Sequence, residues 1–449
     1  MVGVRVWDSE KKAFGELSDI DIQKGVIKSI RSSPGAKKDI VRYLLPGFCD
    51  ASVTIGADSF GGEVTKESLP FYLLSFLSTG FSHVESVADP DLKKVKEEIA
   101  KGRFTGPIIS QSQKPILLPS HFPENDPPTK QYDLVAALEN TGTLFNDKEH
   151  RSKILPIFLK RSTNQSYTQT DLFHLRTDAE KIGFTTVIYS FTDPLSWEDA
   201  LDSGYNIIFH ALPPNANLEP IQKRSYLWAP MLNISYLKSL KENPSILKSK
   251  MITLSKYHPV FRERFNESFA ASLSEEGDSQ KANRDRLTFL NLYQSLRLFP
   301  KERLLFASGA GHYGSFPGIG AMLEAELWLE SWRLDGLVSE IQQTKEREVG
   351  FWQRLWGNFR QESRIQSPHR DIDTVEEGKK ILVDILTKET CSFIKADHRG
   401  LIREGGPAHF SVHKQNPFVS PLGIFAIESM VLGGKLVYTP KPEKVGKKP

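Results

Sequence analysis

Hydrophobic and polar residues alternate in short runs at both ends of the chain. The amino-terminal runs cover residues 4–7 and 25–30, and the carboxyl-terminal runs cover 400–402, 408–412, 424–427 and 434–438. Alternation with a period of two is typical of strands with one buried face. We therefore predict one small β-sandwich domain built from residues 1–45 and 398–440, followed by a short basic tail at 441–449.

Between these ends, short apolar runs of strand length alternate with longer helix-like stretches. The predicted strands cover residues 44–49, 82–87, 107–110, 154–159, 185–189, 206–211, 228–232 and 304–307. Repeated strand–helix units are typical of a parallel α/β sheet, and eight of them predict a closed (β/α)8 TIM-type barrel over residues 46–397. Extra helices must fill residues 238–302, and the uneven spacing leaves an open doubly wound sheet as the alternative.

Composition narrows the class of protein. The 449 residues carry 58 basic and 55 acidic side chains, a formal net charge of +3. This balance argues against nucleic acid as a partner. No segment approaches the roughly 20 apolar residues of a membrane span, and the charged, alternating amino terminus is unlike a signal peptide. With only two cysteines, Cys49 and Cys391, we expect no disulfide framework and a reducing, cytoplasmic location.

The first predicted barrel strand carries the most specific motif. Residues 44–56 read Leu-Leu-Pro-Gly-Phe-Cys-Asp-Ala-Ser-Val-Thr-Ile-Gly. This run resembles the first strand of the amidohydrolase superfamily, which includes imidazolonepropionase-like and dihydroorotase-like enzymes, where Pro-Gly-apolar-x-Asp precedes His-x-His. Ser52 and Thr54 stand at the two histidine positions. Neutral hydroxyls are poor ligands for a divalent metal ion.

The resemblance continues in order along nearly the whole chain. Residues 79–84 and 101–107 resemble the second and third units, and residues 400–412 resemble the segment that re-enters the small domain, with His409 in place of an aspartate. The family's other ligand positions fall on Lys160, Tyr189, His210 and Gly309. Only Lys160 and His210 could bind a metal ion there, because a glycine offers no side chain and a phenol with a pKa near 10 stays protonated.

This resemblance implies metal-dependent hydrolysis of carbon–nitrogen bonds other than peptide bonds, with zinc or another divalent metal. The changes at Ser52, Thr54, Tyr189 and Gly309 instead predict no metal cofactor, and a pseudoenzyme that keeps a binding or scaffolding role. The alternative is an active hydrolase with a rebuilt, metal-free site at the barrel mouth. Its candidate catalytic residues are His210, Lys160, Tyr189 and His312.

Each candidate also has a plainer interpretation. A histidine or lysine at a strand end is often a packing or solvent-facing residue, and Ser308 lacks the turn of a serine nucleophile, so that we expect it to be structural. His83 and His121 are more often surface or loop residues than site residues.

The partners expected are a small-molecule ligand and, compatible with the sequence, a second copy of the chain. The pattern of residues 348–364 predicts an amphipathic helix. We expect its apolar stretch from Phe351 to Phe359 to pack on its own domain; the alternative is contact with a membrane or a partner protein.

Overall fold

The structure is a computed structural model. It describes the following residues: 1–33, 41–57, 59, 63–87, 89, 92–113, 115–117, 151–159, 168–190, 194–210, 226–240, 254, 289, 292–293, 295–296, 299–312, 314–332, 375–420 and 422–440. Several predicted features lie outside them: Lys160, His121, the segment from Phe351 to Phe359, the tail at 441–449 and most of residues 238–302.

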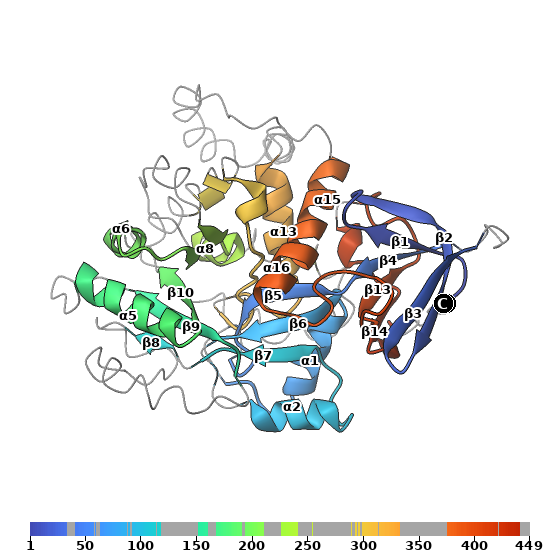
Figure 1. Cartoon of the computed structure of the whole chain (residues 1–449), viewed down its shortest axis with the longest axis horizontal. Coiled ribbons are helices and arrows are strands. Elements are labelled where there is room, and N and C mark those ends of the chain that lie inside the picture. Colours follow the sequence, from blue (N-terminus) through green and yellow to red (C-terminus); the bar gives the residue numbers. More distant parts are fainter. Residues whose placement is uncertain are drawn as a thin grey trace, which may run out of the picture.

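Strands from both ends of the chain form one seven-stranded sheet, which lies to one side of the molecule (Figure 1). Its order is β15-β14-β13-β4-β1-β2-β3. The strands are β1 (Val4–Asp8), β2 (Ala13–Gln23), β3 (Val26–Ser32), β4 (Arg42–Pro46), β13 (Phe410–His413), β14 (Ser429–Leu432) and β15 (Lys435–Tyr438). Alternate residues such as Val4, Leu44 and Phe410 pack in a core of their own. The predicted division into a sandwich of two layers stays a prediction.

Three details of this region differ from the sequence prediction. The apolar run at 44–49 is split, because Pro46 ends β4 in the small sheet and Phe48 begins β5 among the parallel strands. Residues 400–402 and 424–427 do not form strands; Gly423–Phe425 is a turn of 3-10 helix whose residues are all buried. The hairpin partner of β15 is β14, whose position the sequence did not indicate.

The parallel strands lie in two sheets. One is β5 (Phe48–Val53), β6 (Phe81–Ser86) and β7 (Ile108–Gln111). The other is β8 (Ile116–Leu117), β9 (Ile154–Leu159), β10 (Thr185–Ser190), β11 (Ile207–Phe209) and β12 (Leu227–Ala229), all pairing in parallel with their neighbours. Such strands are buried on both faces, which explains why they read as continuous apolar runs.

Backbone hydrogen bonds join these two sheets at both sides. Ser152 N–H donates to Gln111 O across 2.6 Å, and Gln113 N–H donates to Ile154 O across 2.8 Å. On the other side, residues 304–310 lie between β12 and β5. Leu305 N–H donates to Trp228 O, and Ala51 N–H donates to Phe306 O, each across 2.9 Å. The eighth predicted run therefore lies between the last and the first of the parallel strands.

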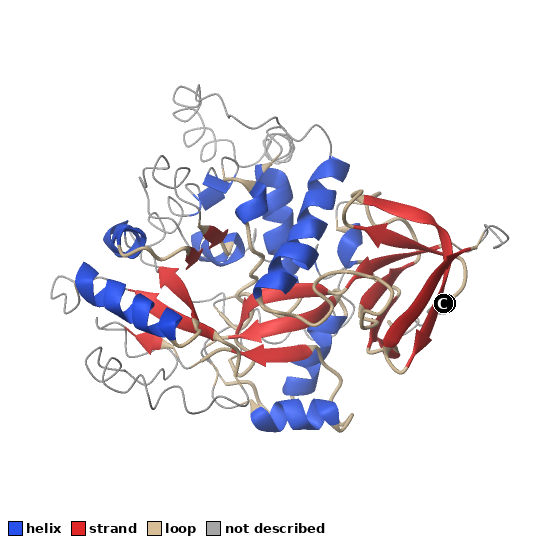
Figure 2. Ribbon diagram, viewed as in Figure 1, coloured by secondary structure: helices blue, strands red, loops and turns tan. Residues whose placement is uncertain are grey.

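Helices cover the parallel strands (Figure 2). They are α1 (Leu69–Leu77), α2 (Lys93–Ala100), α5 (Gln169–Lys181), α6 (Pro194–Asp202), α8 (Leu232–Ser239), α13 (Ile319–Ser331), α15 (Val375–Asp384) and α16 (Thr390–Phe393), with a short π-helix at Ile385–Glu389. The start of α5 is set locally, because Thr168 and Asp171 form a capping box. Among the described residues, no helix is long and apolar enough to cross a membrane.

A disulfide bond joins Cys49, in β5, to Cys391, in α16. The sequence predicts no disulfide framework and a reducing compartment, and it does not predict this bond. The bond ties the first parallel strand to a helix 342 residues later, so the pairing follows from the fold and not from any sequence spacing. Disulfides persist in oxidising compartments, so the cysteine count no longer supports the predicted cytoplasmic location, which stays a prediction.

Candidate functional site

Ser52 and Tyr189 meet near the carboxyl ends of β5 and β10, where barrel-type folds carry their chemistry. The Tyr189 hydroxyl donates to Ser52 Oγ across 3.0 Å, and both residues are buried. The tyrosine ring lies between Phe158 and Phe209, with ring centroids 4.8 and 5.2 Å away. Burial raises the pKa of the Tyr189 phenol above its usual value, so the hydroxyl stays neutral.

Thr54 and His312 also come together. Thr54 donates its hydroxyl hydrogen to Val87 O across 3.0 Å, and His312 Nε2 lies 3.4 Å from the same hydroxyl oxygen. Burial, and to a smaller extent the nearby Lys238, lowers the pKa of His312 to about 4. The imidazole is therefore neutral at physiological pH, and the threonine hydrogen already has an acceptor.

Gly309, which the sequence resemblance aligns with the family's aspartate, is surrounded by apolar side chains. Its φ angle is +58°, in the left-handed region that favours glycine. A β-carbon built there would lie 2.5 Å from Met231 Cε and closer still to Ile234 Cδ1. The space of an aspartate side chain is thus occupied by a methionine and an isoleucine.

Asp50 and Ser308 keep structural roles beside this position. Asp50 Oδ1 accepts hydrogen bonds from the backbone N–H groups of Ser308 (3.0 Å) and Ser52 (3.2 Å). Burial raises the pKa of Asp50 to about 7, although these hydrogen bonds lower it. Ser308 Oγ accepts from Ala310 N–H, which is a local turn contact.

His210 follows β11 and is buried with a φ angle of +77°. Positive φ is uncommon outside glycine, and strained backbone concentrates at functional positions. Its N–H donates to Ala229 O, and its carbonyl accepts from Trp228 Nε1 across 3.1 Å. These bonds fix the backbone of His210 between β11 and β12.

Two buried carboxyl groups in this region were missed from the sequence. Asp89 follows β6 and accepts from the N–H groups of Ile55 (2.7 Å) and Gly56 (2.8 Å), so it braces the loop after β5. Glu85, within β6, accepts from the Ser152 hydroxyl across 2.5 Å, and burial raises its pKa to about 7. An acidic residue inside an apolar strand run was the available signal for Glu85.

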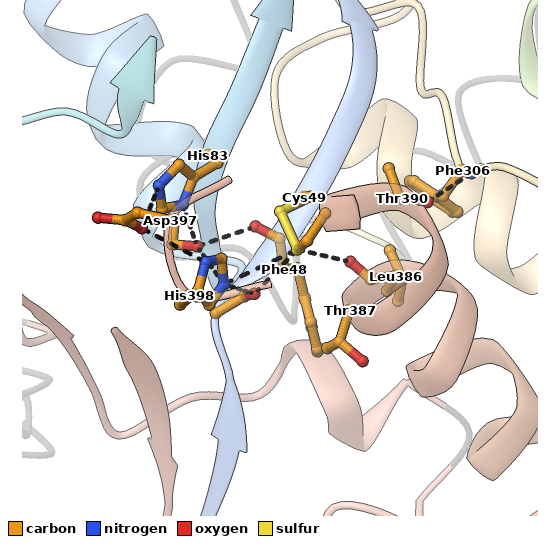
Figure 3. The surroundings of a disulfide bond; sticks show 12 residues. Phe48, Cys49, His83, Phe306, Leu386, Thr387, Thr390, Asp397 and His398 are labelled. Atoms are coloured by element: carbon orange, nitrogen blue, oxygen red, sulfur yellow. Dashed lines mark hydrogen bonds and ion pairs between the residues drawn. A yellow bond between two sulfur atoms is a disulfide. The ribbon is translucent and has the colours of Figure 1, made fainter. Parts of the chain in front are cut away.

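A second group of polar side chains lies near the amino-terminal ends of β5 and β6, next to the disulfide (Figure 3). It comprises His83, Asp397, His398 and His409, which we call the histidine cluster. His83 lies in β6 opposite Cys49, away from the carboxyl ends of the strands. Its Nε2 is 3.1 Å from Asp397 Oδ1, and His409 Nε2 is 3.2 Å from Asp397 Oδ2.

The electrostatics of the cluster differ between the buried rings and the carboxylate. Burial lowers the pKa of His83 to about 4 despite the neighbouring Asp397. The imidazoles hold the pKa of the Asp397 carboxyl far below its usual range, with His398 as the largest contributor. The cluster therefore combines an ionised carboxylate with at least one neutral imidazole.

Two groups among the described residues could hold a metal ion, and neither includes a family ligand position. One is Cys49, Cys391 and His398, in which the two cysteine sulfur atoms are bonded to each other. The other is His83, Asp397 and His409. No sequence motif marks either group, because their members come from segments far apart in the chain.

Comparison with known proteins shows the fold. No protein-family model and no curated protein sequence matches the chain significantly. Solved structures do match: a Xaa-Pro dipeptidase with bound methionine in its active site (TM-score 0.62, 15% identity, 98% of each chain covered) and an amidohydrolase (0.60, 12%, 98% of this chain and 99% of the other). The ochratoxinase of A. niger matches with TM-score 0.59 and 12% identity, over 97% of this chain and 95% of that enzyme. The predicted amidohydrolase-superfamily fold is thereby confirmed.

Proposed function

We propose that this chain is a pseudoenzyme of the amidohydrolase fold, which has lost the family metal site and keeps a binding or scaffolding role. Its retained function is to hold a small-molecule ligand at the mouth or to assemble with a partner, for which a second copy of the chain is the simplest candidate. The structural neighbours are named as hydrolases, but identities of 12–15% carry the fold alone.

The proposed scaffold is a closed (β/α)8 barrel. The hydrogen bonds between Gln111 and Ser152, and those that place residues 304–310 between β12 and β5, support closure. In a closed barrel the carboxyl ends of all strands meet at one face, so Ser52, Tyr189, His210 and Gly309 would line a common mouth.

The observation that carries the proposal is the replacement of ligands by packing. Ser52 and Tyr189 satisfy each other by a hydrogen bond, and Met231 and Ile234 fill the space beside Gly309. A dication needs charged or imidazole ligands to repay its dehydration, and these four side chains offer none. The side chains of Tyr189, Met231 and Ile234 belong to a buried hydrophobic cluster, so this part of the interior serves as core.

The test is metal analysis combined with hydrolysis assays on the full chain. We expect no Xaa-Pro dipeptide or N-acyl amino acid hydrolysis above background, with or without added Zn²⁺ or Mn²⁺. Stoichiometric metal that disappears in His210→Ala, together with metal-dependent hydrolysis, would overturn the proposal.

The alternative is a rebuilt hydrolase that uses His210, His312, Tyr189 and Lys160. The left-handed backbone of His210 and the contact between His312 and Thr54 favour it. Hydrolysis that resists chelators and is lost in His312→Ala would support this alternative against the pseudoenzyme.

A further inference from the structure

The histidine cluster contains buried nitrogen atoms whose protonation is set by their other contacts. His398 Nε2 lies 2.8 Å from Gly47 O, and a carbonyl oxygen only accepts, so this nitrogen carries the ring hydrogen. In the neutral ring, Nδ1 is then an acceptor. It has no hydrogen-bond partner among the described residues, and its nearest polar neighbour is Asp397 Oδ1 at 3.7 Å, which is another acceptor.

His83 presents the same situation from the other side of the carboxylate. The Ser82 hydroxyl has one hydrogen and three polar neighbours: Phe48 O at 3.2 Å, His83 Nδ1 at 2.9 Å and His398 Nε2 at 3.4 Å. When it donates to the carbonyl, it accepts from His83 Nδ1. In that tautomer His83 Nε2 is an acceptor, 3.1 Å from Asp397 Oδ1, and it has no hydrogen-bond partner of suitable geometry in the described part of the chain. A bond from the second ring nitrogen to a fixed oxygen is the outer contact that orients metal-binding histidines.

His409 donates a hydrogen bond to the Asp397 carboxylate and therefore offers no lone pair to a metal ion. Its Nδ1 accepts from Gly433 N–H across 3.0 Å, so its Nε2 carries the hydrogen and donates to Asp397 Oδ2 across 3.2 Å. This bond fixes the carboxylate and leaves Oδ1 turned toward His83 and His398. With His83 in that tautomer, two imidazole lone pairs and one anionic oxygen lie in the same cluster with no hydrogen between them, an arrangement that a bound cation would stabilise.

We propose that His83 Nε2, His398 Nδ1 and Asp397 Oδ1 bind a divalent transition-metal ion of the zinc class, at a site distinct from the barrel mouth. Two imidazoles and a carboxylate are ligands suited to Zn²⁺, Co²⁺ or Ni²⁺, and water supplies the remaining position. The Asp397 side chain is 57% exposed, so an ion can enter from solvent, while both imidazoles are buried.

The rings of His83 and His398 are stacked, with centroids 4.6 Å apart and 15° between their planes. An ion in the plane of His83 therefore requires the His398 ring to turn, which separates the stack. The site would join β6 to the turn after α16, beside the disulfide that already ties α16 to β5. The ion then acts as a second tie at the junction with the small sheet, and this role does not depend on the proposed function.

The experiment is a titration of the chelator-treated full chain with Zn²⁺ by calorimetry and with Co²⁺ by visible absorption. We expect one ion per chain, a raised melting temperature, and a loss of affinity of at least about tenfold in Asp397→Asn and in His83→Gln. Asp397 is exposed, so Asp397→Asn keeps the test valid where a buried histidine variant fails to fold. His174→Ala, which removes an exposed histidine of α5, is the matched control and should bind as the wild type does.

Unchanged binding in Asp397→Asn and His83→Gln would overturn the site. The absence of stoichiometric Zn²⁺ and Co²⁺ binding would also overturn it, and a doubly protonated His398 ring in nuclear magnetic resonance spectra at neutral pH would then show that a proton fills the role of the ion. Binding that is lost in His210→Ala and kept in Asp397→Asn would overturn both this site and the pseudoenzyme. Binding lost in Asp397→Asn alone leaves the proposed function standing.

Discussion

Tyr189 donates its phenolic hydrogen to Ser52 Oγ across 3.0 Å, and by this bond two residues that the sequence resemblance aligns with metal ligands satisfy each other. The residues lie 137 positions apart, on strands of different sheets. A metal site needs acceptor atoms that are free to bind the ion, whereas these two hydroxyls are paired inside a largely apolar core. Under the proposed function, loss of the ligands and repair of the core are one structural change.

We expect Tyr189→Phe to lower the free energy of unfolding by about 1–3 kcal/mol, because the buried Ser52 hydroxyl loses its donor. In a double-mutant cycle with Ser52→Ala, the two losses should be coupled by about 1 kcal/mol. Denaturant unfolding measures both quantities. Tyr205→Phe is the matched control, because Tyr205 donates to Leu172 O across 2.9 Å away from the mouth and should show no coupling to Ser52. Additive losses for Tyr189 and Ser52 would contradict the pairing.

Restoring a side chain at Gly309 should be costly. Gly309→Ala combines a left-handed backbone, worth about 1–2 kcal/mol, with overpacking against Met231 and Ile234, worth about 1–3 kcal/mol. We expect a loss of about 2–4 kcal/mol in unfolding free energy. Gly309→Asp should lose at least as much and should gain no tight metal binding at the mouth.

Gly405→Ala separates the two contributions to that loss. Gly405 has a φ angle of +76°, but a β-carbon there meets nothing within 4 Å. The loss of unfolding free energy in Gly405→Ala therefore measures the backbone cost alone. Adding Ile234→Ala to Gly309→Ala should recover part of the additional loss seen at Gly309. Equal losses at Gly309 and Gly405 would show that the apolar filling exerts no steric effect.

The pH dependence of stability should change when Glu85 is replaced. Burial raises the pKa of Glu85 in the folded chain to about 7 from 4.5, so the folded state binds its proton more tightly than the unfolded state does. This contribution favours folding at low pH and is lost as the pH rises through about 7. Buried histidines such as His413, with a pKa lowered to about 4, act in the opposite direction, so the test is a difference between variants.

Glu85→Gln keeps an oxygen to accept from Ser152 and removes the charge. We expect its stability relative to the wild type to increase by about 1–3 kcal/mol between pH 5 and pH 8. Urea unfolding at several pH values provides the measurement. Glu97→Gln, at an exposed position of α2, is the control and should show no such trend. A constant difference across this range would mean that Glu85 ionises in the folded chain as it does in the unfolded one.

The sequence predicts the strands well and the contacts between distant segments poorly. Parallel strands are buried on both faces, so each reads as a local apolar run. Seven of the eight predicted runs coincide with parallel strands or with residues 304–310, and the run at 44–49 is divided between β4 and β5. The break at Pro46 and Gly47 was missed because apolar residues continue across it. Ser52 and Thr54 could be identified from one motif, whereas the partner of Ser52 depends on how β5 and β10 face each other.

The histidine cluster shows the same limit. His83 lies in a strand, Asp397 and His398 follow a short helix, and His409 precedes β13. No spacing rule links these three segments. Only the disulfide and the strand register bring them within hydrogen-bond distance, so the proposed metal site could not be predicted before the fold was known.

The disulfide should contribute directly to stability. It closes a loop between Cys49 and Cys391 across 342 residues, which restricts the unfolded chain. We expect the double variant Cys49→Ala/Cys391→Ala to lose about 2–5 kcal/mol of unfolding free energy. A reductant should lower the melting temperature of the wild type. It should not change that of the double variant, which has no disulfide and so serves as the control for other effects of the reductant.

Thiol counting tests the bond itself, because the chain has only these two cysteines. Protein unfolded without reductant should react with no equivalents of a thiol reagent, and protein unfolded after reduction should react with two. Both sulfur atoms are fully buried in the folded chain, so the count must be taken on unfolded protein. Two reactive thiols in the unreduced sample would show that the cysteines are free, and the fold would then rely on packing and on the histidine cluster to hold α16 against β5.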